Sequence, residues 1–182
     1  ERVQLLRPAQ GAPRVLAAAP QVEDEAEPLV RRGGRGGEAD GTTQLWIRAL
    51  DSLTPRALPG TEYVRGAFWS PDSRHVGFIV DNTLRRVDTT GGPPETVTSV
   101  PAAALRSGTW NRHGNIVLGS WGGGSGGPLW RVSPAGGAAT AVTEVDLSKG
   151  EFVHTCPTFL PDGNHFLYFR SGPPDVQGMY VG

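Results

Sequence analysis

The chain has 182 residues, enough for a domain with a sizeable hydrophobic core, and its 26 glycines and 16 prolines favour strands and turns over long helices. Its formal net charge of −1 gives no reason to expect nucleic acid or an anionic membrane surface as a partner. The single cysteine, Cys156, excludes an internal disulfide bond, and no apolar run approaches the roughly 18 residues that a membrane-spanning helix needs.

The first part of the chain, residues 1–43, is predicted to be an irregular or degenerate N-terminal segment. Residues 1–10 fit either one strand or a frayed terminus. Residues 17–43 are first rich in Ala, then acidic, then rich in Gly and Arg, with neither the strand period nor the helix period. We therefore expect residues 21–40 to lack regular strands. The segment is either a degenerate repeat or the product of a shifted reading frame.

From Gln44 onward, short apolar runs with two-residue alternation predict strands separated by turn residues, and helix is expected to be nearly absent. The runs fall at residues 44–50, 55–58, 65–70, 75–81, 83–88, 95–98, 107–110, 115–119, 129–133, 139–143, 154–159, 165–170 and 178–181.

A β-hairpin pattern recurs three times along this part of the chain. In the first copy, S-P-D-S at residues 70–73 joins two apolar runs. Pro favours the second position of a type I turn, and Asp and Ser hydrogen-bond to their own backbone, so a hairpin is predicted. N-R-H-G at 111–114 and P-D-G at 161–163 are the other copies. The aromatic residues that precede the turns, at 69, 110 and 159, are spaced 41 and 49 residues apart.

A second repeated unit lies between these hairpins. Residues 84–98 align without gaps with residues 129–143, and seven of the fifteen pairs are identical, including a Gly-Gly pair. Gly-Gly between apolar runs indicates a tight turn, since Gly adopts positive φ without steric cost. Each repeat therefore has four strands over about 40–50 residues, which is typical of a β-propeller blade.

The predicted fold class is all-β: a β-propeller segment with about three four-stranded blades and the start of another, from a larger propeller. The repeats are placed at residues 44–81, 83–119 and 129–170, with the next starting at 178.

The repeat motifs resemble those of a known family. W-S-P-D-S, F-L-P-D-G and L-W-R-V-S-P-A-G-G resemble the WD-repeat-like, TolB-type propeller repeats of bacterial proteins. More narrowly, Q-L-W-I-R-A-L-D-S, L-P-G-T-E and F-W-S-P-D-S resemble the propeller carboxy-terminal to the catalytic domain of some bacterial serine/threonine protein kinases. The resemblance covers about residues 44–182. It implies the appended module and not the catalyst, because the chain has no kinase signature such as H-R-D or D-F-G.

Patterns that could carry catalysis or bind metal fit structural roles better. Residues 123–127 match G-x-S-x-G, but the nucleophile elbow needs a helix after it, and here a strand follows. The histidines lack metal-ligand spacing, and His154-x-Cys156 supplies only two ligands. We therefore predict no catalytic residue, no cofactor and no metal site. The histidines considered were His75, His113, His154 and His165.

Recurring Asp and Trp residues are likewise expected to be structural. Asp72, Asp88 and Asp162 should bond to turn backbone. Trp46, Trp69, Trp110 and Trp130 recur at equivalent repeat positions and should pack between blades. Trp121 lies outside the repeat register. Trp121 is for this reason a candidate contact with a ligand or partner, and His113 and His154 are named with it as candidate contacts.

The sequence thus predicts a non-catalytic binding, sensor or scaffold module that takes a protein or small ligand at one propeller face. By resemblance it is attached to a bacterial serine/threonine kinase. Two alternatives are a propeller that gates a prolyl-oligopeptidase-type serine peptidase and a periplasmic TolB-like interaction protein. Open blade edges predict self-association. Contact with nucleic acid or membrane is not expected, and the compartment stays open between cytoplasmic and extracytoplasmic.

Overall fold

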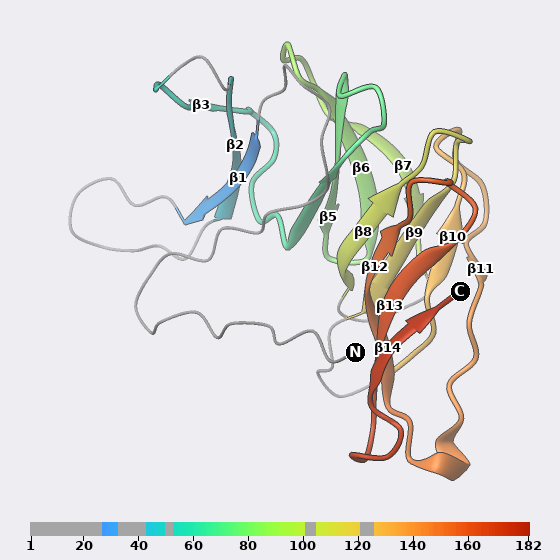
Figure 1. Ribbon diagram of the computed structural model, residues 1–182. Helices are drawn as coiled ribbons and strands as arrows, with labels where there is room; N and C mark the ends of the chain where they lie inside the picture. The colour runs from blue at the N-terminus through green and yellow to red at the C-terminus, as the bar shows by residue number, and fades with distance from the viewer. Residues whose placement is uncertain (1–26, 33–42, 50–52, 101–104, 121–125) are drawn as a thin grey trace.

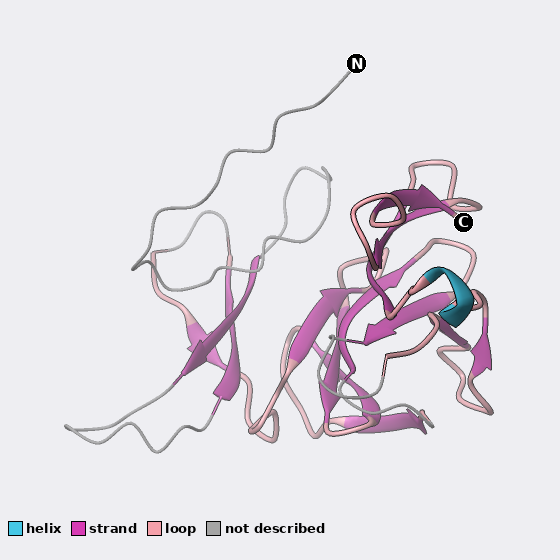
Figure 2. Ribbon diagram, turned by 90° about the horizontal axis from the view of Figure 1, so that it is seen from below, coloured by secondary structure: helices cyan, strands magenta, loops and turns pink. Residues whose placement is uncertain are grey.

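The computed structural model describes residues 27–32, 43–49, 53–100, 105–120 and 126–182. These residues form β-strands and a single short 3₁₀ turn, η1 (Leu147–Lys149), so the expected all-β class is confirmed (Figures 1 and 2). The strands are β1 (Glu27–Arg32), β2 (Thr43–Arg48), β3 (Arg56–Ala57), β4 (Gly66–Trp69), β5 (His75–Val80), β6 (Thr83–Asp88), β7 (Glu95–Ser99), β8 (Leu105–Trp110), β9 (Ile116–Ser120), β10 (Trp130–Val132), β11 (Thr140–Ala141), β12 (Val153–Phe159), β13 (Phe166–Ser171) and β14 (Gly178–Val181).

The strands form four antiparallel sheets in chain order: β1-β2-β3, β4-β5-β6-β7, β8-β9-β10-β11 and β12-β13-β14. Each strand pairs with its neighbours in sequence, so every sheet is a simple meander. The boundaries of the sheets differ from those of the predicted repeats at residues 44–81, 83–119 and 129–170. Each predicted range combines the last two strands of one sheet with the first two strands of the next sheet. All strands predicted from Gln44 onward are present, with ends within two residues of the predicted ones.

Strand β1 contradicts the expectation that residues 21–40 lack regular strands. It pairs with β2 over its whole length, from Glu27 opposite Arg48 to Arg32 opposite Thr43. This pairing satisfies the backbone groups of β2 whatever side chains β1 carries, which explains why side-chain periodicity did not reveal it. Residues 1–26 and 33–42 lie outside the described part of the chain.

Hydrophobic side chains fill the spaces between neighbouring sheets. Successive side chains of a strand point to opposite faces, so Phe78 of β5 packs towards the first sheet and Ile79 towards the third. Trp69, Trp110 and Trp130 pack against these clusters, as predicted, whereas Trp46 of β2 is not among the residues of these clusters. The buried members are Leu45, Ile47, Leu58, Val64, Val76, Phe78 and Val87 between the first and second sheets; Phe68, Ile79, Leu84, Val100, Leu105, Ile116, Leu118 and Val132 between the second and third; and Val117, Leu129, Phe166 and Tyr168 between the third and fourth.

The first strands of neighbouring sheets also contact each other directly. The backbone N–H of Cys156 in β12 donates to Ser107 Oγ in β8 at 3.2 Å, and that of Phe159 donates to Thr109 Oγ1 at 3.2 Å. At Gly66 in β4, an added Cβ would lie 2.0 Å from the Arg106 carbonyl oxygen, so only Gly permits this approach of β4 to β8.

Because the strands alternate in direction, the connections divide between two ends of the sheets. The turn end carries the Asp-containing hairpin turns and the Gly-Gly turns. There, Asn111 Nδ2 donates to the Gly163 carbonyl at 2.7 Å and joins the turns of adjacent sheets. The loop end carries the connections between sheets and the longer loops, including residues 142–152 and 172–177. The loop end therefore offers more varied surface than the turn end.

Candidate functional site

An open hollow of about 720 Å³ lies at the loop end of the third sheet, within the size range of ligand pockets. Its wall is mostly apolar, and Thr143 and Glu144 add polar groups. Gly126 lies against the loop before β12, since an added Cβ there would lie 1.6 Å from the Phe152 carbonyl oxygen. The apolar side chains of the wall are Pro128, Ala141, Val142, Val145, Leu147 and Phe152.

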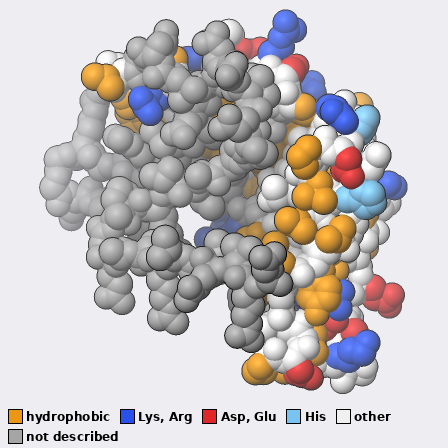
Figure 3. All heavy atoms as spheres, in the orientation of Figure 1, with side chains coloured by type: hydrophobic (Ala, Val, Ile, Leu, Met, Phe, Trp, Pro, Cys, Tyr) orange, Lys and Arg blue, Asp and Glu red, His pale blue; other side chains and the backbone are white. Residues whose placement is uncertain are grey.

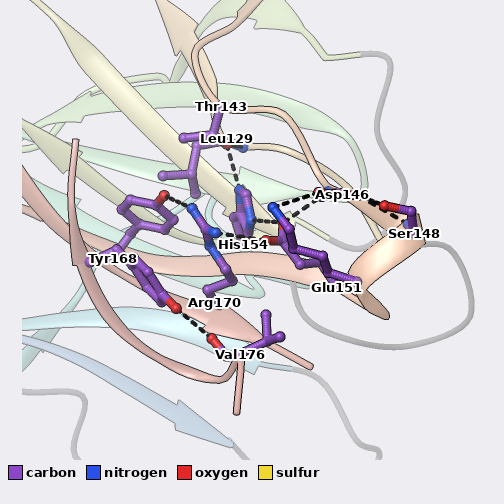
Figure 4. Close-up of polar contacts among 11 residues, drawn as sticks. Leu129, Thr143, Asp146, Ser148, Glu151, His154, Tyr168, Arg170 and Val176 are labelled. Carbon is purple, nitrogen blue, oxygen red and sulfur yellow. Dashed lines mark hydrogen bonds and ion pairs between the residues drawn. The ribbon is translucent and has the colours of Figure 1, made fainter. Parts of the chain in front are cut away.

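A buried polar network lies behind this wall (Figure 4). His154, at the start of β12, is fully buried, and its Nδ1 lies 2.8 Å from Thr143 Oγ1. Its Nε2 lies 3.2 Å from Glu151 Oε2. The other Glu151 oxygen, Oε1, accepts a hydrogen bond from Arg170 Nη1 at 2.6 Å. The wall residue Thr143 is thus connected to strands β12 and β13.

The same carboxylate also fixes the loop that carries the wall. Backbone N–H of Asp146 donates to Glu151 Oε2 at 2.8 Å, and that of Glu151 donates to the Asp146 carbonyl at 3.1 Å. The Asp146 side chain in turn accepts the N–H of Ser148 and caps η1. Gly150 ends the turn at φ 72°, in the left-handed region that favours Gly. Loop 142–152 is therefore held at both ends.

Burial and charge set the protonation of the network. Burial lowers the pKa of His154 below its ordinary 6.5; the hydrogen bond to Glu151 opposes this shift, and the charge of Arg170 adds to it. Burial favours the neutral form of Glu151, but the Asp146 N–H, the His154 hydrogen bond and the Arg170 charge together keep its pKa below 4.5. A neutral His154 therefore donates a hydrogen bond from Nε2 to an ionised Glu151, and its Nδ1 accepts a hydrogen bond from the Thr143 hydroxyl.

Aromatic rings hold the remaining member of the network. Arg170 Nη2 donates to the Tyr168 hydroxyl at 2.9 Å, and its guanidinium carbon lies 4.0 Å from the centroid of the Tyr180 ring. Such contacts over an aromatic face are favourable. The Tyr180 hydroxyl donates to the Val176 carbonyl at 2.6 Å, which ties loop 172–177 to the same assembly.

The order hydroxyl, imidazole, carboxylate in Thr143, His154 and Glu151 is that of a base-activated nucleophile. Two observations favour a structural role instead. The Thr143 hydroxyl oxygen already accepts the backbone N–H of Leu129 at 2.8 Å, and the imidazole has no exposed surface from which to pass a proton to a substrate. The network therefore supports the wall.

No group of three or more His, Cys, Asp or Glu side chains in the described ranges is arranged to hold a metal ion. Within the same ranges, no helix is long and apolar enough to cross a membrane.

The three predicted contact residues do not come together. His154 lies behind the hollow, one hydrogen bond from its wall through Thr143. His113 is exposed at the turn end, where its backbone N–H donates to Asn111 Oδ1 at 3.1 Å. Trp121 lies outside the described residues.

Sequence reasoning missed Glu151, Arg170 and Thr143. The sequence did contain one signal. Arg170 follows Phe166 and Tyr168 at two-residue spacing and so lies on the same inward face of the strand, where a charged side chain needs a partner of opposite charge.

A second surface of interest is the outer face of the last sheet, formed by Leu167, Phe169, Met179 and Val181. Leu167 pairs with Val181 and Phe169 with Met179 across β13 and β14, so these side chains share one face. Met179 and Val181 are 58% and 62% exposed. Figure 3 shows hydrophobic side chains gathered in a band over these strands.

No family model and no curated protein matches the sequence. Among solved structures, TolB from Acinetobacter baumannii is similar with a TM-score of 0.59 and 16% identity, over 76% of this chain and 34% of TolB. A putative TolB from Agrobacterium tumefaciens gives 0.53 and 18%, over 74% of this chain and 45% of that protein. A puromycin hydrolase gives 0.57 and 16%, over 86% of this chain and 25% of the hydrolase.

The chain thus spans less than half the length of each of these proteins. At such identities the similarity concerns the fold, and it carries nothing about a kinase context. It agrees with the sequential antiparallel sheets of three and four strands and with the hydrophobic clusters packed between them. The chain therefore has a partial β-propeller fold that is similar to that of TolB.

Proposed function

We propose that this chain is a non-catalytic binding module that takes a protein segment or small ligand in the hollow at its loop end. The observation that carries the proposal is the hollow itself, an apolar concavity with a few polar groups, formed mainly by the loops at the end of the third sheet. Leu147 and Phe152 at this hollow remain 78% and 42% exposed. Large apolar side chains exposed together are typical of interaction sites.

The buried network supports this proposal because it fixes the position of the wall in the absence of a ligand. Glu151 and His154 hold loop 142–152 through hydrogen bonds of 2.8–3.2 Å. A loop already fixed loses less conformational entropy on binding, which favours affinity.

The proposal can be tested by NMR titration of the isotope-labelled chain with a panel of short peptides and small apolar ligands. We expect shift changes at residues 126–129 and 142–152, and their loss in the double variant Leu147→Ser, Phe152→Ser. The matched control is Leu53→Ser, which changes a side chain that is 93% exposed elsewhere. Shift changes confined to the turn end, or unaffected by the double variant, would contradict the proposal.

A non-catalytic role also predicts that the chain does not hydrolyse esters. The test compares p-nitrophenyl acetate hydrolysis by the chain and by Thr143→Val, which removes the hydroxyl beside His154. Equal rates are expected. A rate that falls to background in Thr143→Val would show instead that the hydroxyl, imidazole and carboxylate act as a catalytic unit.

For the wider context, we propose attachment to a bacterial serine/threonine kinase, on the resemblance of Q-L-W-I-R-A-L-D-S and F-W-S-P-D-S. The similarity of fold to TolB and to a puromycin hydrolase favours two alternatives, an interaction protein and a propeller that gates a peptidase. The gene sequence on either side discriminates between them. Kinase motifs upstream support the first, a hydrolase domain downstream supports the gating propeller, and a signal peptide upstream without either supports the interaction protein.

A further inference from the structure

The charged side chains around the hollow indicate which charge a bound ligand should carry. Glu144 lines the hollow, is exposed, and has no ion-pair partner among the described residues. No Lys, Arg or His side chain is among the described residues that line the hollow. Behind the wall, the lowered pKa of His154 keeps that ring neutral near pH 7.

The neighbouring charges are already compensated. The Asp146 carboxylate pairs with Lys149 Nζ at 3.0 Å and accepts the hydroxyl of Ser148. Arg170 is paired with Glu151. Among the described residues, the uncompensated charge at the hollow is therefore the negative charge of Glu144, which lies beside an apolar wall.

We infer that the hollow selects an extended peptide segment of a partner protein in which a Lys or Arg is adjacent to a large apolar side chain. This inference rests on the proposed binding function. The apolar side chain lies against Val142, Leu147 and Phe152, and the cation lies against the Glu144 carboxylate. Leu147 and Phe152 remain accessible from solvent, which suits a side chain carried by a passing segment better than a small ligand that must be enclosed.

The test uses blocked tetrapeptides in NMR titrations of the whole chain: Gly-Leu-Lys-Gly, Gly-Leu-Glu-Gly and Gly-Gly-Lys-Gly. We expect the Leu-Lys peptide to bind about threefold to fivefold more tightly than the Leu-Glu peptide, the effect of one exposed ion pair. The preference should shrink as salt is raised. The Gly-Lys peptide should bind weakly, because it lacks the apolar side chain.

Variants at one position assign the preference. Glu144→Gln should abolish it, and Glu144→Lys should reverse it in favour of the Leu-Glu peptide. The matched control is Asp175→Asn, an exposed carboxylate of the same end that does not line the hollow, and it should keep the preference. A further ligand, n-pentylammonium, carries the same two groups without a peptide backbone and should bind more weakly than the Leu-Lys peptide.

The outcomes separate this inference from the proposed function. Equal binding of the Leu-Lys and Leu-Glu peptides in the hollow overturns the charge selection and leaves the binding function standing. Binding of n-pentylammonium as tight as that of the peptide overturns the assignment to a peptide segment. The absence of any shift change in the hollow, with every ligand, overturns both proposals.

Discussion

His154 and Arg170 lie directly opposite each other across the β12–β13 pair, and each bonds to a different oxygen of one buried carboxylate. The carboxylate belongs to Glu151, whose side chain is 1% exposed. An isolated buried charge is costly, whereas one with several hydrogen-bond donors is tolerated. Glu151 has three such donors, since the Asp146 N–H also bonds to it.

Removal of this carboxylate should therefore be costly. We expect Glu151→Ala to lower the free energy of unfolding by about 1–3 kcal/mol, the usual effect of leaving a buried donor such as His154 Nε2 without its acceptor. Glu144→Ala, in the same loop but exposed, should change it by no more than about 0.5 kcal/mol. Urea denaturation followed by tryptophan fluorescence measures both. Equal midpoints would show that the network does not stabilise the fold.

Stability should fall on acidification because of His154. Its folded pKa is lowered below 6.5, so the unfolded chain binds more protons than the folded chain once the pH drops below that value. The contribution of His154 is fully present above about pH 6.5 and is lost as the pH falls through the folded pKa. The pKa of Glu151 is also lowered, from 4.5, so its titration likewise reduces the stability of the fold as the pH falls, but at more acidic pH.

The measurement is the urea midpoint at pH 8 and pH 5 for the natural chain and for His154→Gln. The natural chain should lose more stability between the two pH values than the variant does. An equal loss of stability in the natural chain and in the variant would show that groups other than His154 cause the pH dependence.

Packing between the second and third sheets depends on the absence of a side chain at Gly108. An added Cβ would lie 2.3 Å from Phe68 Cε1 and 2.9 Å from Leu118 Cδ2. We expect Gly108→Ala to destabilise the chain by about 1–3 kcal/mol through overpacking. Gly127→Ala is the control, because nothing lies within 4 Å of its Cβ position.

A double-variant cycle identifies the cause. In a Phe68→Leu background, Gly108→Ala should lower the free energy of unfolding by less, because the aromatic ring that the added methyl group contacts is absent. The same cost in both backgrounds would mean that the strain arises in the backbone.

The outer face of the last sheet should mediate self-association. On the same face of the earlier sheets, Ile79 and Val117 of the second strands, which correspond to Leu167 and Phe169, are at most 2% exposed because the next sheet covers them. Met179 and Val181 have no such cover in the described residues, and β14 pairs with β13 alone. Such edges pair with other chains. We therefore expect concentration-dependent association in sedimentation velocity runs.

Charges on that face should suppress the association. The variant Met179→Lys, Val181→Lys should sediment as a monomer, while Leu53→Lys, at a solitary exposed side chain, should behave like the natural chain. A natural chain that stays monomeric at high concentration would contradict this prediction.

The strands were predictable because their signals are local. The turn at residues 70–73 is specified by its own Pro, Asp and Ser, and Asp72 accepts the N–H of Arg74 as expected. Strand β1 was not predictable in this way, because its place depends on the free edge of β2 and not on its own periodicity.

The polar network shows a different limit. Thr143 aligns with Thr98 in the repeat, so the sequence presents it as one more repeat residue. In the structure Thr98 Oγ1 donates to the Gly137 carbonyl at 2.7 Å, whereas Thr143 bonds to His154. The difference arises from loop 142–152, which brings Glu151 and His154 to one copy of the repeat. The hydrogen-bond partners of Thr143 are supplied by a loop that only one repeat has, so the sequence pattern common to all repeats does not predict them.

The meander order of the sheets also bears on how the chain folds. Each strand finds its partner in the segment synthesised just before it, so no sheet waits for a distant part of the chain. A hairpin forms in about 1–10 μs, whereas a ribosome adds only about 5–20 residues per second. Each sheet can therefore close during synthesis and present a finished apolar face to the next sheet in the chain.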